Sequence, residues 1–219
     1  MSDIDLYKGD CLDIVAVSLF DGLSGGRIAL ERTPNLNVLR YYSSEVDKYA
    51  IQVADKNYPQ DTEFRLGDVT KIDFVKLKQE IQEEFGDIEI LLVGGFPCQS
   101  YSMAGKREGI NSTNGQLIYD VFRAIEDLNP DNVLLENVKG LVTIDKGETF
   151  KHILQELNLI GYAVDFININ SNLVSAQNRE RVYIIGKRLD NCKGLYYNMP
   201  YSKENINATL KKSTHGRIS

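Results

Sequence analysis

Short apolar runs of strand length alternate along this chain with segments that have the spacing of amphipathic helices. The strands are predicted at Val15–Phe20, Leu39–Ser44, Glu63–Leu66, Ile88–Val93, Asn132–Leu135, Ala163–Ile169 and Val182–Gly186. The helices are predicted at Arg27–Arg32, Asp47–Asn57, Phe74–Phe85, Gln116–Leu128 and Thr149–Leu159. Strands that alternate with helices are typical of a doubly wound, mostly parallel sheet, so we expect an α/β fold.

The size and composition of the chain are those of an ordinary globular domain. Its 219 residues are 42% hydrophobic and 26% charged, which is enough for a substantial core. No apolar segment approaches the length that spans a membrane, and the first residues lack the basic and apolar regions of a signal peptide. We therefore expect a soluble cytoplasmic protein with no membrane partner.

Cysteine and histidine usage points away from a metal site or a disulfide framework. Cys11, Cys98 and Cys192 are widely spaced and have neither a CxxC pattern nor a neighbouring histidine. We interpret His152 and His215 as surface residues and expect no metal. The net charge of −6 gives no support of its own for nucleic-acid binding, since contacts to phosphate rely on lysine and arginine.

The first third of the chain has the layout of a nucleotide-type cofactor site. A strand at Val15–Phe20, a glycine-rich turn at Asp21–Gly26 and a helix let backbone amides approach such a ligand, although an ordinary strand-to-helix turn has the same pattern. Glu45 follows the second strand and is placed to accept hydrogen bonds from ribose hydroxyls. Asp68 is placed to accept from an adenine amino group or to cap the next helix. These residues alone fit either NAD or S-adenosylmethionine.

A cysteine lies on a loop at the end of the strand Ile88–Val93. The loop reads Gly95-Phe96-Pro97-Cys98-Gln99, in which the glycine permits close approach and the proline stiffens the backbone. A free cysteine is most often a small buried hydrophobe. Here the flanking residues are polar or turn-forming, and Lys106 and Arg107 favour the thiolate. We therefore interpret Cys98 as a reactive thiol.

Further polar candidates flank the later strands. Glu136 directly follows the apolar strand Asn132–Leu135, where a carboxyl group is either a proton donor or a solvated loop residue. Arg179 and Arg181 lie in the polar stretch before Val182, which is either a solvated hairpin loop or a site where a guanidinium holds a base carbonyl or the catalytic loop.

The loop at Cys98 resembles the catalytic Pro-Cys-Gln loop of the cytosine carbon-5 DNA methyltransferases of bacteria and phages. The resemblance runs in family order from about Val15 to about Arg188, and its other motifs are the Phe-x-Gly-x-x-Gly turn at 20–25, Glu-Asn-Val at 136–138 and Gln-x-Arg-x-Arg at 177–181. It implies the Rossmann-like fold of S-adenosylmethionine-dependent methyltransferases.

The resemblance implies a set of residues that bind S-adenosylmethionine. These are Phe20, Gly22, Gly25, Glu45, Asp68 and Pro97. Two positions depart from the pattern of the family: Ser18 stands where many bacterial members have aspartate, and Val46 stands where an aromatic residue that stacks on adenine is frequent.

The resemblance also implies a reaction, the methylation of cytosine at carbon 5 in double-stranded DNA. The target base is flipped out of the duplex, and the Cys98 thiolate attacks its ring carbon 6. Glu136 protonates ring nitrogen 3, while Arg181, with Arg179, steadies the base. The role in the cell, whether restriction-modification, phage protection or gene control, stays open.

We expect three parts in the chain: residues 1–14 as a leader, residues 15–188 as the catalytic and cofactor-binding domain, and residues 189–219 as a poorly ordered start of a target-recognition region. Complete family members continue into a target-recognition domain and final motifs. The resemblance therefore implies either a truncated form or one subunit of a split enzyme whose second chain carries recognition. A catalytically silent partner, an RNA cytosine methyltransferase and a dehydrogenase are the rival hypotheses.

Overall fold

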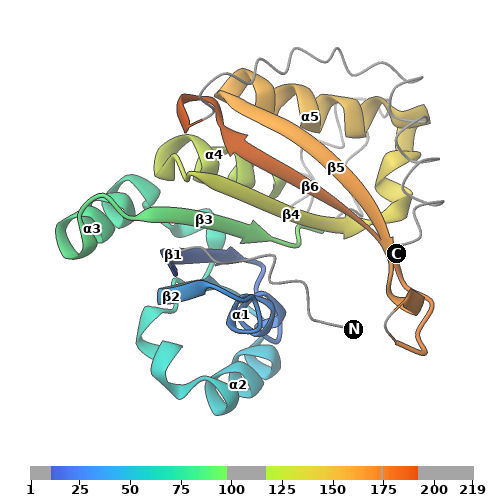
Figure 1. Cartoon of the computed structure of the whole chain (residues 1–219). Coiled ribbons are helices and arrows are strands. Elements are labelled where there is room, and N and C mark those ends of the chain that lie inside the picture. The colour runs from blue at the N-terminus through green and yellow to red at the C-terminus, as the bar shows by residue number, and fades with distance from the viewer. Residues whose placement is uncertain (1–10, 98–116, 174, 192–219) are drawn as a thin grey trace, which may run out of the picture. The chain divides into compact units, whose positions relative to one another are not determined.

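The computed structural model describes residues 11–97, 117–173 and 175–191. The described residues form two compact units that are divided between Val93 and Gly94. Each unit contains three strands together with helices (Figure 1). The α/β fold predicted from the sequence is confirmed.

The first unit is organised around a central buried strand. Strands β1 Leu12–Leu19, β2 Leu36–Ser44 and β3 Glu89–Gly94 hydrogen-bond in the order β2-β1-β3, and β1 runs parallel to β2. From Ile14 onward every residue of β1 is buried. A parallel strand with both faces covered needs a continuous apolar run, which is what the sequence provides here.

The helices of the first unit begin within two residues of their predicted starts, and only the third begins at the predicted residue. They are α1 Gly25–Glu31, α2 Lys48–Asn57 and α3 Phe74–Phe85. Asp47 caps α2 by accepting from the backbone N–H groups of Tyr49 and Ala50, and Asp73 caps α3 by accepting from that of Lys76. Such caps satisfy donors that the first helical turn leaves without partners.

The prediction of a strand at Glu63–Leu66 is wrong. A 3₁₀-helix occupies Pro59–Phe64, and only Arg65 forms an isolated parallel bridge, with Ser43. Pro59 begins the helix with a fixed φ. Phe64 packs edge-on against the Tyr42 ring with 5.7 Å between centroids. Contacts of this kind override the weak strand propensity of four residues.

The second unit contains a sheet in which the middle strand is reversed. Strands β4 Asn132–Val138, β5 Tyr162–Asn170 and β6 Glu180–Arg188 lie in the order β4-β6-β5, and β6 runs antiparallel to both neighbours. Helices α4 Leu117–Leu128 and α5 Glu148–Ile160 lie on one side of this sheet (Figure 1). Short 3₁₀ segments complete the unit at Lys139–Val142, Ile144–Gly147, Ser171–Leu173 and Leu189–Asn191.

Burial alternates along these strands and decides which side chains are free for chemistry. Val133 and Leu135 of β4 are buried, and Phe166 of β5 packs edge-on against Phe150 of α5 with 5.0 Å between ring centroids. The intervening residues of β4 and β6 are only half-buried or exposed. β4 continues through Glu136 to Val138, beyond its predicted end, so Glu136 lies within the strand and on the less buried face.

Candidate active site

The turn between β1 and α1 has an unusual backbone. Phe20, Gly22 and Ser24 all have positive φ values, 56°, 57° and 60°. For a residue other than glycine this conformation costs on the order of 1 kcal/mol. The turn is tied to the end of β2, because the Asp21 backbone N–H donates to the Ser44 carbonyl at 3.0 Å. The geometry therefore depends on contacts outside the turn.

Glu45 connects the turn to the end of β2. Its Oε2 accepts from the Gly22 backbone N–H at 2.7 Å, and its Oε1 accepts from the N–H groups of Val46 and Asp47 at 2.8 and 2.9 Å. The structure thus brings together Glu45 and Gly22, two predicted cofactor residues. Since a carboxylate oxygen has two acceptor positions, Oε2 keeps one for a ligand hydroxyl.

The backbone of this turn is open at two of its glycines. A Cβ built at Gly22 or at Gly25 would meet no described atom within 4 Å. Val46 follows Glu45 with 71% of its surface exposed, so it offers an apolar contact next to the carboxylate. The turn therefore presents open backbone, a carboxylate acceptor and an exposed apolar side chain next to one another in the sequence.

Asp68 acts as a helix cap, the second of the two roles expected for it. Its Oδ1 accepts from the Thr70 hydroxyl at 2.8 Å and from the Thr70 backbone N–H at 3.1 Å, and Lys71 Nζ lies 3.5 Å from Oδ2. The hydrogen bonds from Thr70 lower the pKa of the Asp68 carboxyl. Oδ2 receives no hydrogen bond from Thr70, so this oxygen retains acceptor capacity.

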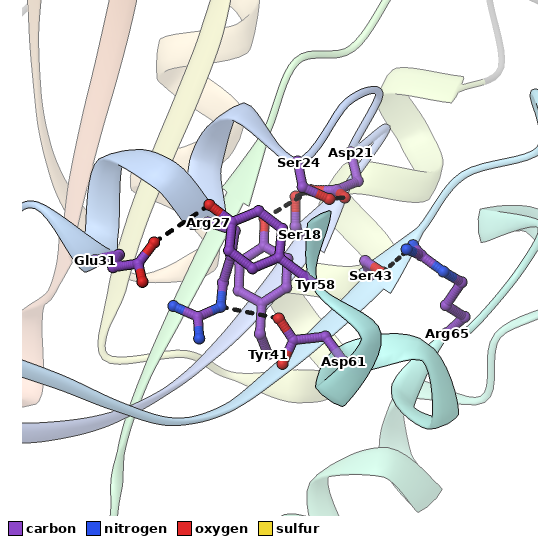
Figure 2. A network of polar contacts seen from close by, with 10 residues as sticks. All are labelled: Ser18, Asp21, Ser24, Arg27, Glu31, Tyr41, Ser43, Tyr58, Asp61 and Arg65. Carbon is purple, nitrogen blue, oxygen red and sulfur yellow. Dashed lines mark hydrogen bonds and ion pairs between the residues drawn. The ribbon is translucent and has the colours of Figure 1, made fainter. Parts of the chain in front are cut away.

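Asp21 is a buried residue of the turn that the sequence analysis did not single out. Its carboxylate accepts hydrogen bonds from the hydroxyls of Ser18, Ser24 and Tyr41 (Figure 2). The available signal was the spacing, because hydroxyl residues stand three positions before and three positions after this aspartate. Gly26 lies close by, and a Cβ there would be 3.1 Å from the Tyr41 hydroxyl.

In the second unit, the segment that leads to Cys98 is fixed to β4. Cys98 itself lies outside the described residues. Phe96 is buried, and its carbonyl accepts from Asn137 Nδ2 at 2.7 Å. A Cβ built at Gly95 would be 3.5 Å from Glu136 Oε2, so the backbone passes close to this carboxylate. Pro97, the last described residue of the segment, is half-buried.

Glu136 lies against two arginines from the β5-β6 hairpin. Arg181 Nε is 2.8 Å from Glu136 Oε1, and Arg179 Nη2 is 3.9 Å from the same oxygen. Arg181 Nε makes no aligned hydrogen bond to a described residue, so the close contact is an ion pair. Arg181 pairs in the sheet with Val138, two residues after Glu136, which puts both charged side chains on one face.

Two further findings concern metal binding and membrane spanning. The described ranges 11–97, 117–173 and 175–191 contain no group of three or more His, Cys, Asp or Glu side chains that could hold a metal ion. Among the helices of those ranges, none is long and apolar enough to span a membrane.

Comparison with known proteins identifies the family of this chain. A model of the C-5 cytosine-specific DNA methylases matches residues 14–217. The chain belongs to this family. The type II methyltransferase M1.ScrFI of Lactococcus lactis subsp. cremoris is 40% identical over 171 residues, which are 78% of this chain and 40% of that protein. The type II methyltransferase M.SsoII of Shigella sonnei is 37% identical over 208 residues, 93% of this chain and 51% of that protein.

The chain thus spans about half the length of these curated relatives, or less. Among solved structures, the methyltransferase EhMeth of Entamoeba histolytica has a TM-score of 0.61 at 19% identity, over 80% of this chain and 53% of that one. At this identity the likeness shows the fold, and the Rossmann-like methyltransferase fold expected above is confirmed. Membership of the family implies S-adenosylmethionine as the methyl donor.

Proposed function

We propose that this chain carries the cofactor-binding and catalytic residues of an enzyme that methylates carbon 5 of cytosine in DNA. The observation that supports this most directly is the Glu136–Arg181 ion pair of 2.8 Å, next to the anchored segment that leads into Cys98. The pair joins two predicted catalytic residues. Gly95, three positions before Cys98, lies beside the same carboxylate.

The proposed cofactor site lies in the first unit. Gly22 and Gly25 leave room for the ligand, and Glu45 Oε2 accepts from a ribose hydroxyl. Val46 and Phe20 provide apolar contacts, and Asp68 Oδ2 accepts from an amino group. The family resemblance also assigns Pro97 to the proposed set. S-adenosylmethionine, when bound, supplies the methyl group.

The proposed chemistry on the base uses residues of the second unit. The Cys98 thiolate forms a bond to carbon 6 of a flipped cytosine, which moves electron density to carbon 5. Glu136, in its protonated form, gives a proton to ring nitrogen 3. Arg181 occupies Oε1 of Glu136, so Oε2, on the Gly95 side, is the oxygen left for the base. After carbon 5 has taken the methyl group, a base removes the carbon-5 proton, the bond between carbon 6 and sulfur breaks to regenerate the thiolate, and nitrogen 3 returns its proton to Glu136.

The rest of the enzyme is also part of the proposal. The relatives are about twice as long as the matched part of this chain or longer. We propose that the recognition of a sequence in duplex DNA requires a target-recognition domain, supplied by a second chain or by a longer form of this one. The curated relatives come from bacteria and from Bacillus phages, so we propose the cytoplasm of a bacterial or phage-infected cell as the location.

The test is transfer of labelled methyl groups from S-adenosylmethionine to mixed-sequence duplex DNA, with structured RNA as the rival acceptor. Calorimetry measures cofactor binding in parallel, with NAD as the rival ligand. Cys98→Ser is expected to abolish transfer and to spare cofactor binding. Cys11→Ser is the matched control, since Cys11 is exposed and free.

Three results would change the proposal. Undiminished transfer by Cys98→Ser would refute the covalent mechanism. Preferential transfer to structured RNA would indicate that the substrate is RNA rather than DNA. Binding of S-adenosylmethionine without transfer to either acceptor would indicate that the chain either needs a target-recognition domain or serves as a silent partner. Addition of such a domain from a relative would restore transfer only in the first case.

A further inference from the structure

The Asp21 carboxylate collects hydrogen bonds from three separate parts of the first unit. Ser18 Oγ on β1 donates to Oδ1 at 2.7 Å, Tyr41 OH on β2 donates to Oδ1 at 2.6 Å, and Ser24 Oγ at the end of the turn donates to Oδ2 at 2.5 Å (Figure 2). Asp21 is only 8% exposed. Short bonds to an ionised acceptor are about twice as strong as neutral ones.

The three donors have little freedom to leave the carboxylate. Ser18, Ser24 and Tyr41 are all buried. Burial, and next the charge of Asp21, raise the pKa of the Tyr41 phenol, so this group keeps its proton and stays a donor. α1 closes the other side, because a Cβ at Gly26 would come within 3.1 Å of the Tyr41 hydroxyl.

A buried carboxylate without these donors would be costly, so the three hydrogen bonds stabilise the observed geometry. That geometry includes the backbone on both sides of Asp21. Phe20 and Gly22 have left-handed φ values, and the Gly22 N–H donates to Glu45 Oε2 at 2.7 Å. A shift of the carboxylate would therefore shift the amide that holds Glu45.

We propose that Asp21, held by the hydroxyls of Ser18, Ser24 and Tyr41, is a positioning residue that presets Gly22 and Glu45 for the cofactor. The inference rests on the proposed function for the identity of the ligand. Its physical content is that the turn is ordered before binding, so the ligand does not have to supply the free energy of ordering it.

The test compares S-adenosylmethionine affinity across matched variants of the full chain. Asp21→Asn keeps the shape and removes the charge, and we expect the Kd to rise about tenfold. Tyr41→Phe removes one donor and keeps the ring, and we expect a rise of about threefold. Tyr58→Phe is the control, since its hydroxyl bonds the exposed Glu31 at 3.2 Å rather than Asp21.

A second readout separates positioning from simple loss of stability. Hydrogen exchange of the Gly22 amide should accelerate in Asp21→Asn and Tyr41→Phe, well below their melting temperatures, and stay at the wild-type rate in Tyr58→Phe. Ser18 Oγ lies 2.7 Å from Asp21 Oδ1, so exchange of the two side chains keeps one carboxylate and one hydroxyl next to each other. The double variant Ser18→Asp with Asp21→Ser should recover part of the lost affinity.

The outcomes are distinguishable. Failure of the wild-type chain to bind S-adenosylmethionine would overturn the proposed function, and the Gly22 exchange rates would still decide whether Asp21 orders the turn. Binding by the wild type with unchanged Kd and unchanged Gly22 exchange in Asp21→Asn and Tyr41→Phe would overturn the role of Asp21 alone.

Discussion

The contribution of the Glu136–Arg181 ion pair to the free energy of unfolding can be measured. At the observed separation of 2.8 Å, the Coulomb attraction is about 6 kcal/mol for an effective dielectric constant of about 20. This figure is an upper bound, because the Arg181 and Glu136 side chains remain 18% and 34% exposed and water screens them. We expect Glu136→Gln to lower the free energy of unfolding by about 1.5 kcal/mol, between the values typical of exposed and buried pairs.

The assay is urea unfolding of the wild type, Glu136→Gln, Arg181→Met and the double variant. The double-mutant cycle isolates the pair, and we expect a coupling energy of about 1 kcal/mol. The same cycle with Arg179→Met is the control. Arg179 lies 3.9 Å from Glu136 and is 51% exposed, so its coupling should stay below about 0.5 kcal/mol.

Salt supplies an independent check on the same pair. In about 1 M NaCl the Debye length falls to about 3 Å, which should remove the Arg179 coupling and leave most of the Arg181 coupling. Equal coupling energies for the two arginines, or a value for Arg181 within about 0.3 kcal/mol of zero, would refute the view that Arg181 holds the carboxylate.

Three other changes give independent expectations. Gly22→Ala meets no steric clash but forces alanine to a φ of 57°, so urea unfolding should show a loss of about 1 kcal/mol, and an unchanged midpoint would contradict the left-handed turn. Burial raises the pKa of the Tyr162 phenol, which donates to the Pro130 carbonyl, so the folded state binds this proton more tightly than the unfolded chain does. The resulting contribution to the free energy of unfolding is complete below about pH 10 and is lost at higher pH. Tyr162→Phe should therefore flatten the alkaline decline in stability. Asp47→Ala removes the cap of α2 and should cost about 1 kcal/mol, seen as a lower melting temperature that Asp47→Asn largely avoids.

Local periodicity was sufficient to find most of the elements. The helix α3 has the predicted bounds Phe74–Phe85, because its apolar spacing and its cap both lie within a few residues. The strand at Glu63–Leu66 failed for the opposite reason: four residues carry little periodic signal, and contacts with Tyr42 decide their conformation. The end of β4 was missed because it is set by pairing with β6, about 45 residues away.

In the candidate site, too, the sequence predicts which residues take part but not the contacts between them. Glu45 could be placed near the glycine turn by its distance along the sequence, but its bond to the Gly22 amide requires the packing of β2 beside β1. The contact of Arg181 with Glu136 requires the register of β4 and β6, which no local pattern encodes. Ser18, a departure from the aspartate of many family members, acquires a reason only in the structure, where it donates to Asp21.

The closeness of Gly26 to the Tyr41 hydroxyl has a consequence for how this part of the chain changes over evolutionary time. Alanine at position 26 would bring its Cβ to 3.1 Å from that oxygen and 3.4 Å from Val93, so the Tyr41 hydroxyl would have to move slightly, and a shorter residue at position 41 would relieve the contact. A shorter residue there removes a donor from Asp21, which leaves the anion at position 21 under-coordinated. Positions 21, 26 and 41 should therefore covary among descendants of this sequence and be replaced as a group.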